Sequence, residues 1–142
     1  MPSKKCDQAA QCPCGSGAAY EACCAPFVRG EEFAQTAEKL MRSRYAAFAK
    51  GAEGYLLASW HPSTRPSRVR IDPKQKWIGL AIKSTEAGSV ADDAGIVEFV
   101  ARFKVAGKGH RLHERSRFEL IEGRWYYLEG DHLSGNAGKV VA

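Results

Sequence analysis

The clearest hydrophobic pattern in the chain is helical and follows residue 36. Apolar side chains recur there at steps of three and four residues, with Arg44 set among them: Ala37, Leu40, Met41, Tyr45 and Phe48. This spacing turns one face of an α-helix toward a core. The Thr36 hydroxyl is suited to an N-cap and Gly51 to a helix end. We therefore predict a helix that begins after Thr36 and stops at Gly51.

A second, shorter helix is predicted over residues 53–60, with Tyr55, Leu56 and Trp60 facing inward. This helix should stop before His61-Pro62, because a proline disfavours helical backbone in the residue before it. The two helices would then form a hairpin.

After the connection HPSTRP, the pattern changes to that of β-strands. Candidate strands cover residues 68–71, 77–83, 96–105, 111–121 and 124–128. Alternate residues are apolar from 97 to 105, which predicts one buried and one polar face. The connections are short and hold no helix long enough for a parallel crossover, so the strands should be antiparallel. Helices followed by strands predict an α+β fold.

Composition places the chain among folded soluble proteins. It has 142 residues, of which 44% are hydrophobic and 26% charged, enough for one domain with a small appendage. The composition shifts near Arg29 and Gly30, so we predict a small module over residues 1–30 and a larger domain over 31–142. No stretch resembles a signal peptide or a membrane span, which favours a cytoplasmic protein without membrane insertion.

The net charge of +5 and the pI near 9.0 permit attraction to phosphates or to an acidic partner. Basic residues are concentrated in segments 65–76 and 102–117. The simplest interpretation is a solvated basic face, and nucleic acid is only weakly supported as a partner. The pattern leaves the oligomeric state open.

Four of the five cysteines lie in the stretch CPCGSGAAYEACC, residues 12–24. In a reducing compartment such clusters are metal ligands or redox groups more often than disulfides. A thiophilic ion such as zinc needs about four N or S donors. Cys12 and Cys14 project to one side of an extended chain, and two glycines let the backbone return. The adjacent cysteines can both reach one ion only if the backbone there forms a tight turn or begins a helix.

The same stretch resembles the SEC-C motif, a small metal-binding module also found at the carboxyl end of the SecA translocation ATPase. The resemblance lies in CPCGSG, in Tyr20 and in the final pair of cysteines. It implies zinc as the bound ion, with iron as the alternative, and it leaves Cys6 outside the motif. The implied metal ligands are Cys12, Cys14, Cys23 and Cys24.

Four thiolates around one divalent ion have a net charge of −2. Lys4, Lys5 and Arg29 are near in sequence and could offset this charge. A redox role for Cys23 and Cys24 is disfavoured, because four committed thiolates leave none free. The expected role of the ion is to hold together a segment too small for a core of its own.

The rest of the chain resembles the bacterial YchJ-like (UPF0225) proteins through LMRSRYAAFAKG, WHPSTRP, GIVEFVARF, LHERSRF and GRWYYLEG. That resemblance implies an NTF2-like, cystatin-type domain, with helices packed on a curved antiparallel sheet, in agreement with the α+β prediction. Folds of this kind enclose a hollow that serves enzymes, ligand binders and structural proteins alike, so the fold assigns no activity.

Candidate residues for a pocket or an interaction surface are polar side chains within strongly patterned segments. They are Arg44, Tyr45, His61, Arg65, Glu98, His113, Glu114 and Arg115. Each has a structural interpretation that we prefer, as a helix cap, a core side chain or a solvated charge. No spacing specifies an acid–base pair, and the phosphate-loop, GxSxG and HExxH motifs are absent, so no catalytic residue is assigned.

Two functions therefore stay open. The favoured one is a non-enzymatic adaptor that binds a protein, in secretion or translation if the SEC-C analogy extends so far. The alternative is a small-molecule binder or enzyme that uses the hollow. A hollow filled by aromatic side chains favours the first, and an open one with converging polar groups favours the second.

One buried ion pair is also predicted. Period-two alternation puts Glu114 on the apolar face of its strand, with His113 and Arg115 on the opposite face. Arg44 interrupts the apolar stripe of the first helix, so both charges would lie where helix and sheet meet. Because an unpaired buried charge is costly, we predict that Arg44 and Glu114 pair and line the hollow, unless a β-bulge reverses the faces.

Overall fold

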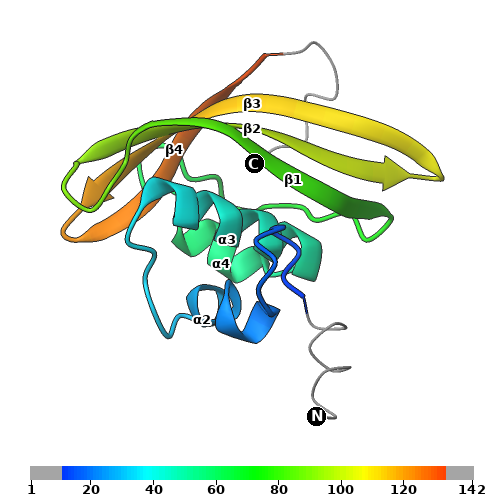
Figure 1. The fold of residues 1–142 in the computed structure, drawn as a ribbon, viewed down its shortest axis with the longest axis horizontal. Coiled ribbons are helices and arrows are strands. Elements are labelled where there is room, and N and C mark those ends of the chain that lie inside the picture. The colour runs from blue at the N-terminus through cyan, green and yellow to red at the C-terminus, as the bar shows by residue number, and fades with distance from the viewer. Residues whose placement is uncertain (1–10, 134–142) are drawn as a thin grey trace.

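The structure is a computed structural model that describes residues 11–133. The helical part consists of η1 (Tyr20–Ala22), α2 (Ala25–Val28), α3 (Ala37–Lys50) and α4 (Glu53–Ala58). The strands are β1 (Gln75–Ala87), β2 (Ala94–Val105), β3 (Lys108–Ile121) and β4 (Arg124–His132). Figure 1 shows α2, α3 and α4 on one side of a curved sheet, which confirms the predicted α+β class.

Helix α3 has the boundaries that the sequence predicts. The Thr36 hydroxyl accepts a hydrogen bond from the Lys39 backbone N–H at 3.1 Å, and Gly51 ends the helix with a φ of 75°. Glycine adopts this left-handed backbone conformation more readily than other residues because it has no Cβ. Helix α4 ends at Ala58, before the predicted end, because the chain then pairs with β4. The Tyr127 N–H donates to the Ser59 carbonyl, and the His61 N–H donates to the Tyr127 carbonyl.

The four strands are hydrogen-bonded in sequence order, β1-β2-β3-β4, and every neighbouring pair is antiparallel. The predicted strand over residues 68–71 is wrong. Its Val69 N–H donates to the Glu53 carboxylate at 3.0 Å, and Arg68 forms an ion pair with that carboxylate. Val69 packs with Ala47 and Leu56 in a small second core. The apolar pattern therefore reflects packing on the helices and not strand pairing.

The main core lies between α3 and the inner face of the sheet. Buried side chains of α3, such as Leu40 and Met41, pack against residues of β2, β3 and β4, and the cluster also includes Cys12, Cys14 and Cys24. The cysteine segment is thus seated on the same core as the sheet. The boundary after residue 30 stays a prediction. None of the described helices has the length and apolar character needed to cross a membrane.

Candidate metal centre

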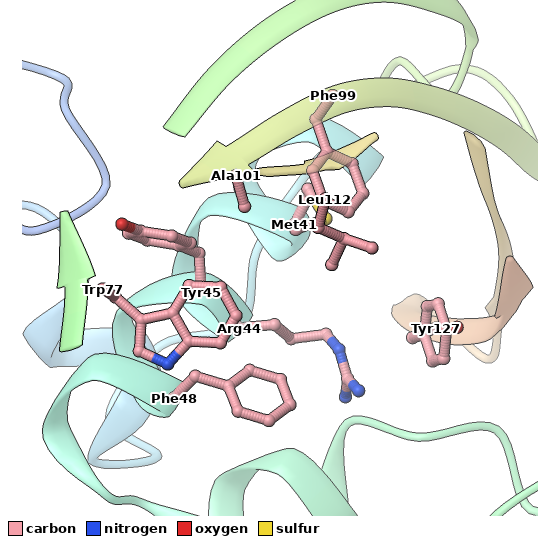
Figure 2. A pocket seen from close by; sticks show the side chains of 9 residues that line it. All are labelled: Met41, Arg44, Tyr45, Phe48, Trp77, Phe99, Ala101, Leu112 and Tyr127. Carbon is pink, nitrogen blue, oxygen red and sulfur yellow. The ribbon is translucent and has the colours of Figure 1, made fainter. Parts of the chain in front are cut away.

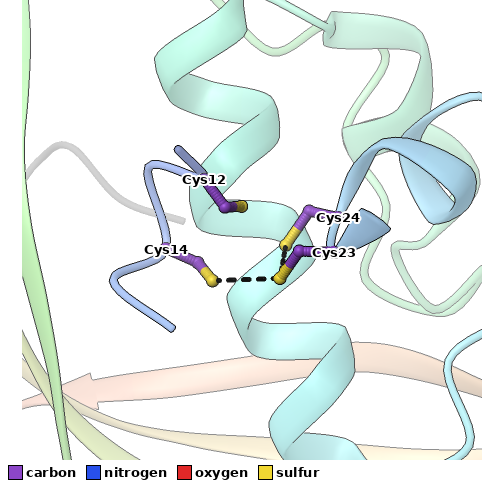
Figure 3. A group of neighbouring side chains, drawn as sticks. All are labelled: Cys12, Cys14, Cys23 and Cys24. Carbon is purple, nitrogen blue, oxygen red and sulfur yellow. Dashed lines mark hydrogen bonds between the residues drawn. The ribbon is translucent and has the colours of Figure 1, made fainter. Parts of the chain in front are cut away.

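The sulfur atoms of Cys12, Cys14, Cys23 and Cys24 form one compact group. All four lie within 4.8 Å of one another. The Cys14 and Cys23 sulfurs are 3.7 Å apart, and those of Cys23 and Cys24 are 3.9 Å apart (Figure 3). Four thiolates at about 2.3 Å from a tetrahedral ion are about 3.8 Å from one another. The spacing therefore suits a single metal ion of this type.

The backbone of the CPCGSG segment folds into a tight loop that carries the first two cysteines. The Cys12 N–H donates to the Ala18 carbonyl at 2.9 Å, and the Gly15 N–H donates to the Cys12 carbonyl at 3.2 Å. Gly15 and Gly17 have φ angles of 82° and 91°, which side chains rarely tolerate. The sequence CPCGSG thus supplies glycine at the positions where the loop requires it.

The adjacent pair of cysteines lies where one helix ends and the next begins. Cys23 follows η1 as its C-cap, and Cys24 is the N-cap of α2. This change of direction lets two neighbouring side chains converge, as Figure 3 shows. It meets the requirement, stated from the sequence, for a turn or a helix start at this point.

Burial and shared hydrogen bonds shift the pKa values of three of these thiols in different directions. Burial raises the pKa of Cys12 to about 11. A hydrogen bond with the Cys24 side chain lowers the pKa of Cys14 to about 4, and the same bond, together with burial, raises the pKa of Cys24. Without a metal, these shifts favour a thiolate at Cys14 and protonated thiols at Cys12 and Cys24. A metal ion has to displace those protons, so binding strengthens as pH rises.

Arg42 of α3 is a site residue that the sequence did not reveal. Its guanidinium Nη1 donates to the Cys14 carbonyl at 2.9 Å and lies 4.0 Å from the Cys14 sulfur. The cation expected there, Arg29, pairs instead with Glu21 at 2.7 Å. Because Cys14 and Arg42 are 28 residues apart, no local pattern could connect them.

Three residues named from the sequence, Cys6, Lys4 and Lys5, lie outside the described residues. Their part in the metal centre stays a prediction. The same holds for the ligand role of the four clustered cysteines, which the structure supports by distance alone.

A groove of about 640 Å³ runs beside the sulfur cluster, between the cysteine module and α3. Cys23, the least buried of the four cysteines, opens onto it. Both charged and apolar side chains form its walls, among them Ser16, Glu21, Pro26, Phe27, Glu32 and Arg42. The metal centre is therefore partly accessible from this one groove.

The hollow between α3 and the sheet is almost filled. A cavity of about 20 Å³ remains, which is room for about one water molecule. Figure 2 shows aromatic and aliphatic side chains around it, with the Arg44 guanidinium pointing toward Tyr127. The lining residues are Met41, Arg44, Tyr45, Phe48, Trp77, Phe99, Ala101, Leu112 and Tyr127.

Arg44 is fully buried and is held by neutral groups. Its Nη1 donates to the Leu56 carbonyl at 2.9 Å and to the Ser59 hydroxyl at 2.7 Å. The guanidinium also lies over the rings of Trp60 and Tyr127, at 4.9 and 4.5 Å from their centres. Burial lowers the pKa of Arg44 to about 10. Its Nη2 has no hydrogen-bond partner among the described residues.

Glu114 lies on the inner face of β3, as predicted, but its predicted ion pair with Arg44 is wrong. Glu114 accepts a hydrogen bond from the Ser116 hydroxyl at 2.9 Å, and His132 Nδ1 lies 3.6 Å away. Arg44 is bound by the carboxyl end of α4 and Glu114 by β3 and β4. Glu114 does not line the cavity, and burial raises the pKa of its carboxyl group.

His61 connects the segment after α4 to the sheet. Its Nε2 lies 2.6 Å from the Glu119 carboxylate, and its Nδ1 accepts from the backbone N–H and faces the hydroxyl of Ser63, at 3.0 and 2.9 Å. This order of hydroxyl, imidazole and carboxylate resembles a nucleophilic relay. However, the Ser63 N–H occupies the same lone pair, and neither the cavity of the hollow nor the groove beside the sulfur cluster includes these three side chains. We interpret the set as structural.

The other candidates form contacts outside the group of four cysteines. Arg65 donates twice to the Trp60 carbonyl. On the outer face of the sheet, His113 pairs with Glu98 at 2.7 Å and Arg115 with Glu86 at 2.8 Å. Among the candidates named from the sequence, the structure gathers the four cysteines into one group, pairs Glu98 with His113, and places Arg44 and Tyr45 together in the lining of the hollow.

Comparison with known proteins adds two family matches. Residues 10–26 match the SEC-C motif, and residues 36–130 match the middle NTF2-like domain of YchJ. A UPF0225 protein of Chromobacterium violaceum is 54% identical over 134 residues, which cover 92% of this chain and 98% of that protein. A UPF0225 protein of Streptomyces coelicolor is 49% identical over 122 residues, with coverages of 86% and 95%.

Two solved structures resemble the chain. The solution structure of a SEC-C motif containing protein from Rhodopseudomonas palustris is 34% identical, with a TM-score of 0.76 over 87% of this chain and 98% of that one. The crystal structure of a SEC-C motif containing protein from Psychrobacter arcticus is 26% identical, with a TM-score of 0.71 over 90% and 85%. The chain therefore belongs to the UPF0225 family, with a SEC-C motif followed by a YchJ-like NTF2-like domain.

Proposed function

We propose that this protein is a zinc-binding, non-enzymatic adaptor whose SEC-C module presents a groove to a protein partner. The observation that carries the proposal is the group of four sulfurs within 4.8 Å, which borders a groove of about 640 Å³. The hollow of the NTF2-like domain, with about 20 Å³, offers a substrate far less room. The alternative, a ligand or substrate in the hollow, would require the aromatic side chains around Arg44 to move.

Zinc is the ion that this donor set favours. Structural zinc sites are tetrahedral and closed, with four protein ligands and no open position. The four cysteines supply these four ligands, and three of them are buried. Iron also accepts four thiolates, so it stays the alternative. A reducing cytoplasm, where we place the protein, would keep the thiols free to bind.

The metal is tested on the full chain, purified without chelator. Native mass spectrometry and elemental analysis should find one zinc per chain. Cys14→Ser should lose most of it, and Cys6→Ser should keep it. Iron at full occupancy, or no metal in the wild-type protein, would refute the assignment to zinc.

The adaptor role is tested by filling the groove without touching a ligand. Ala22 lines the groove and is exposed, so Ala22→Arg should keep its zinc and lose the partner in cross-linking and affinity purification from cell extract. Ala91→Arg, an exposed position in the β1–β2 connection, is the matched control and should retain the partner. Recovery of the same proteins with Ala22→Arg would contradict the proposal.

A further inference from the structure

The outer face of the sheet carries its charges in two different ways. Figure 1 shows that the helices lie on the other side, and within the described residues no helix covers this face. At the end of this face where β3 meets β4, two arginines of β3 have acidic partners. Arg115 pairs with Glu86, and Arg117 pairs with Glu129 and Asp131 at 3.0 Å each. The charges of these two arginines are therefore offset by carboxylates of the same sheet.

At the opposite end, cations stand beside cations. Lys76 of β1 is directly opposite Lys104 of β2, and Arg102 of β2 is directly opposite Arg111 of β3. Directly opposed residues in an antiparallel pair share a face at close range, and like charges there are destabilising. We call Lys76, Arg102, Lys104 and Arg111 the basic face. All four are exposed, and none forms an ion pair within residues 11–133.

The side chains on the inner face of these strands do not neutralise the four cations. Phe103 and Trp77, which alternate with the cations along β2 and β1, point inward and contact each other with ring centres 5.1 Å apart. The cations thus stand at alternate positions that face water. A sheet that pairs its arginines at one end and opposes like charges at the other is suited to an anion supplied from outside.

We propose that the basic face binds the phosphate backbone of a nucleic-acid duplex, without reading its sequence. Exposed lysines and arginines gain affinity for a polyphosphate simply by releasing its counterions. A protein partner instead needs a desolvated aromatic or aliphatic anchor in a pocket, and neither the groove beside the sulfur cluster nor the cavity of the hollow includes any of these four residues. The outer positions of β1, β2 and β3 also hold no Phe, Tyr or Trp on which single-stranded bases could stack.

The test measures binding of the full-length, metal-loaded protein to a fluorescent DNA duplex of about 20 base pairs by anisotropy, at salt from about 50 to 200 mM. Four phosphate contacts predict a slope of log K against log salt of about −3 to −4. In the double variant Lys76→Gln/Lys104→Gln the slope should shrink by about two units, and affinity at low salt should fall by at least about tenfold.

The matched control is Lys39→Gln, an exposed lysine on α3, on the helical side of the molecule. It removes one charge and should leave duplex affinity within about twofold, because it lies off the basic face. A single strand of the same length should bind more weakly than the duplex. Equal duplex binding by the wild type and the double variant, or a slope near zero, would overturn the proposal.

Two further probes separate nucleic acid from other anionic partners. They are a labelled poly-glutamate peptide and vesicles that contain phosphatidylserine. Weaker binding of both than of the duplex is the expected result. Tighter binding of either one, lost in the double variant, would assign the basic face to that class and refute the assignment to nucleic acid.

Discussion

Arg42 lies where a side chain could tune the candidate metal centre without being a ligand. It donates to the Cys14 carbonyl and approaches the Cys14 sulfur, while Glu38 fixes its other edge at 3.0 Å. With a divalent ion bound to the four thiolates, this cation would offset part of their net charge of −2. Partners of this kind orient the ligands of a metal and tune its affinity.

We therefore predict that Arg42→Gln lowers zinc affinity by about 10- to 100-fold, the usual effect of losing a hydrogen bond to a ligand residue. Competition with a chromophoric chelator measures it. Arg29→Gln is the matched control, because Arg29 also belongs to the module but pairs with Glu21. Equal zinc affinity of the two variants would show that Arg42 contributes only to packing.

Glu114 has a carboxyl group whose burial outweighs its hydrogen bond from Ser116 and its attraction to His132 and Arg44. The pKa is thus higher in the folded protein than in the unfolded chain. As pH rises from the unfolded pKa to the folded pKa, Glu114 releases its proton in the unfolded chain before it does so in the folded protein. The contribution of Glu114 to stability is therefore greatest below the unfolded pKa and is lost as pH rises from the unfolded pKa through the folded pKa.

We predict that Glu114→Gln, which cannot ionise, gains stability relative to the wild type as pH rises from about 5 to about 8. Denaturant unfolding measures the free energy of unfolding of both proteins in the same buffers. Because both keep the same cysteines, effects of pH on the metal centre cancel in the difference. The exposed Glu122→Gln is the control and should show no such trend. A relative loss of stability at the higher pH would mean that attraction to Arg44 dominates.

Single residues also show where the sequence was informative. Alternation along β3 placed Glu114 inside and His113 outside, and both assignments are confirmed by burial. Alternation could not give the partner of Arg44, because its acceptors belong to the end of α4. The face of a charge follows from local periodicity, whereas its partner depends on how separate elements pack.

At the scale of elements, the pairing of β1 with β2 places two lysines opposite each other, which should cost stability. Lys104 faces Lys76 across the strand pair, with neighbouring strands about 4.8 Å apart. We predict that Lys104→Glu, which turns this like-charge pair into an opposite-charge pair, raises the free energy of unfolding by about 0.2–1 kcal/mol. Thermal unfolding at low salt measures the change.

High salt should reduce this gain, since the charges are exposed. Lys39→Glu serves as a control, because it changes the same charge away from the sheet. If Lys104→Glu lowered the melting temperature at low salt, repulsion across β1 and β2 would not be the dominant interaction. A stabilising substitution that weakens duplex binding would show that the opposed cations are kept for binding.

The elements themselves were predictable to the extent that their hydrophobic period is local. The α3 caps and the four sheet strands follow from Thr36, Gly51 and the alternating runs. Residues 68–71 carry a similar apolar pattern, yet Glu53 binds the backbone there and Val69 packs on the helices. A short apolar run therefore does not distinguish strand pairing from a packed coil.

At the scale of the whole molecule, the cysteine module and the sheet domain meet on one core. Cys14 is fully buried and Cys24 nearly so, in the cluster that also holds Leu40 and Phe99. Lys50 at the end of α3 lies 4.6 Å from the centre of the Tyr20 ring. The separate module expected from the sequence is thus in extensive contact with α3, while the sheet has hydrogen bonds and a core of its own.

We therefore predict a graded response when chelator removes the metal. Residues 11–28 should lose hydrogen-exchange protection first, because metal binding supplies most of the folding free energy of such a small segment. Helix α3 should lose part of its protection, since the module covers one side of it. The centres of β2 and β3, which pair with neighbours on both edges, should remain protected.

Hydrogen exchange with mass spectrometry, before and after chelation, resolves these three regions. Readdition of zinc should restore the module and α3 together, whereas Cys6→Ser should respond as the wild type does. Equal loss of protection in β2 and in the module would contradict this order. In that case the shared core would make the chain a single cooperative unit, and the ion would stabilise the sheet as directly as it stabilises the cysteine loop.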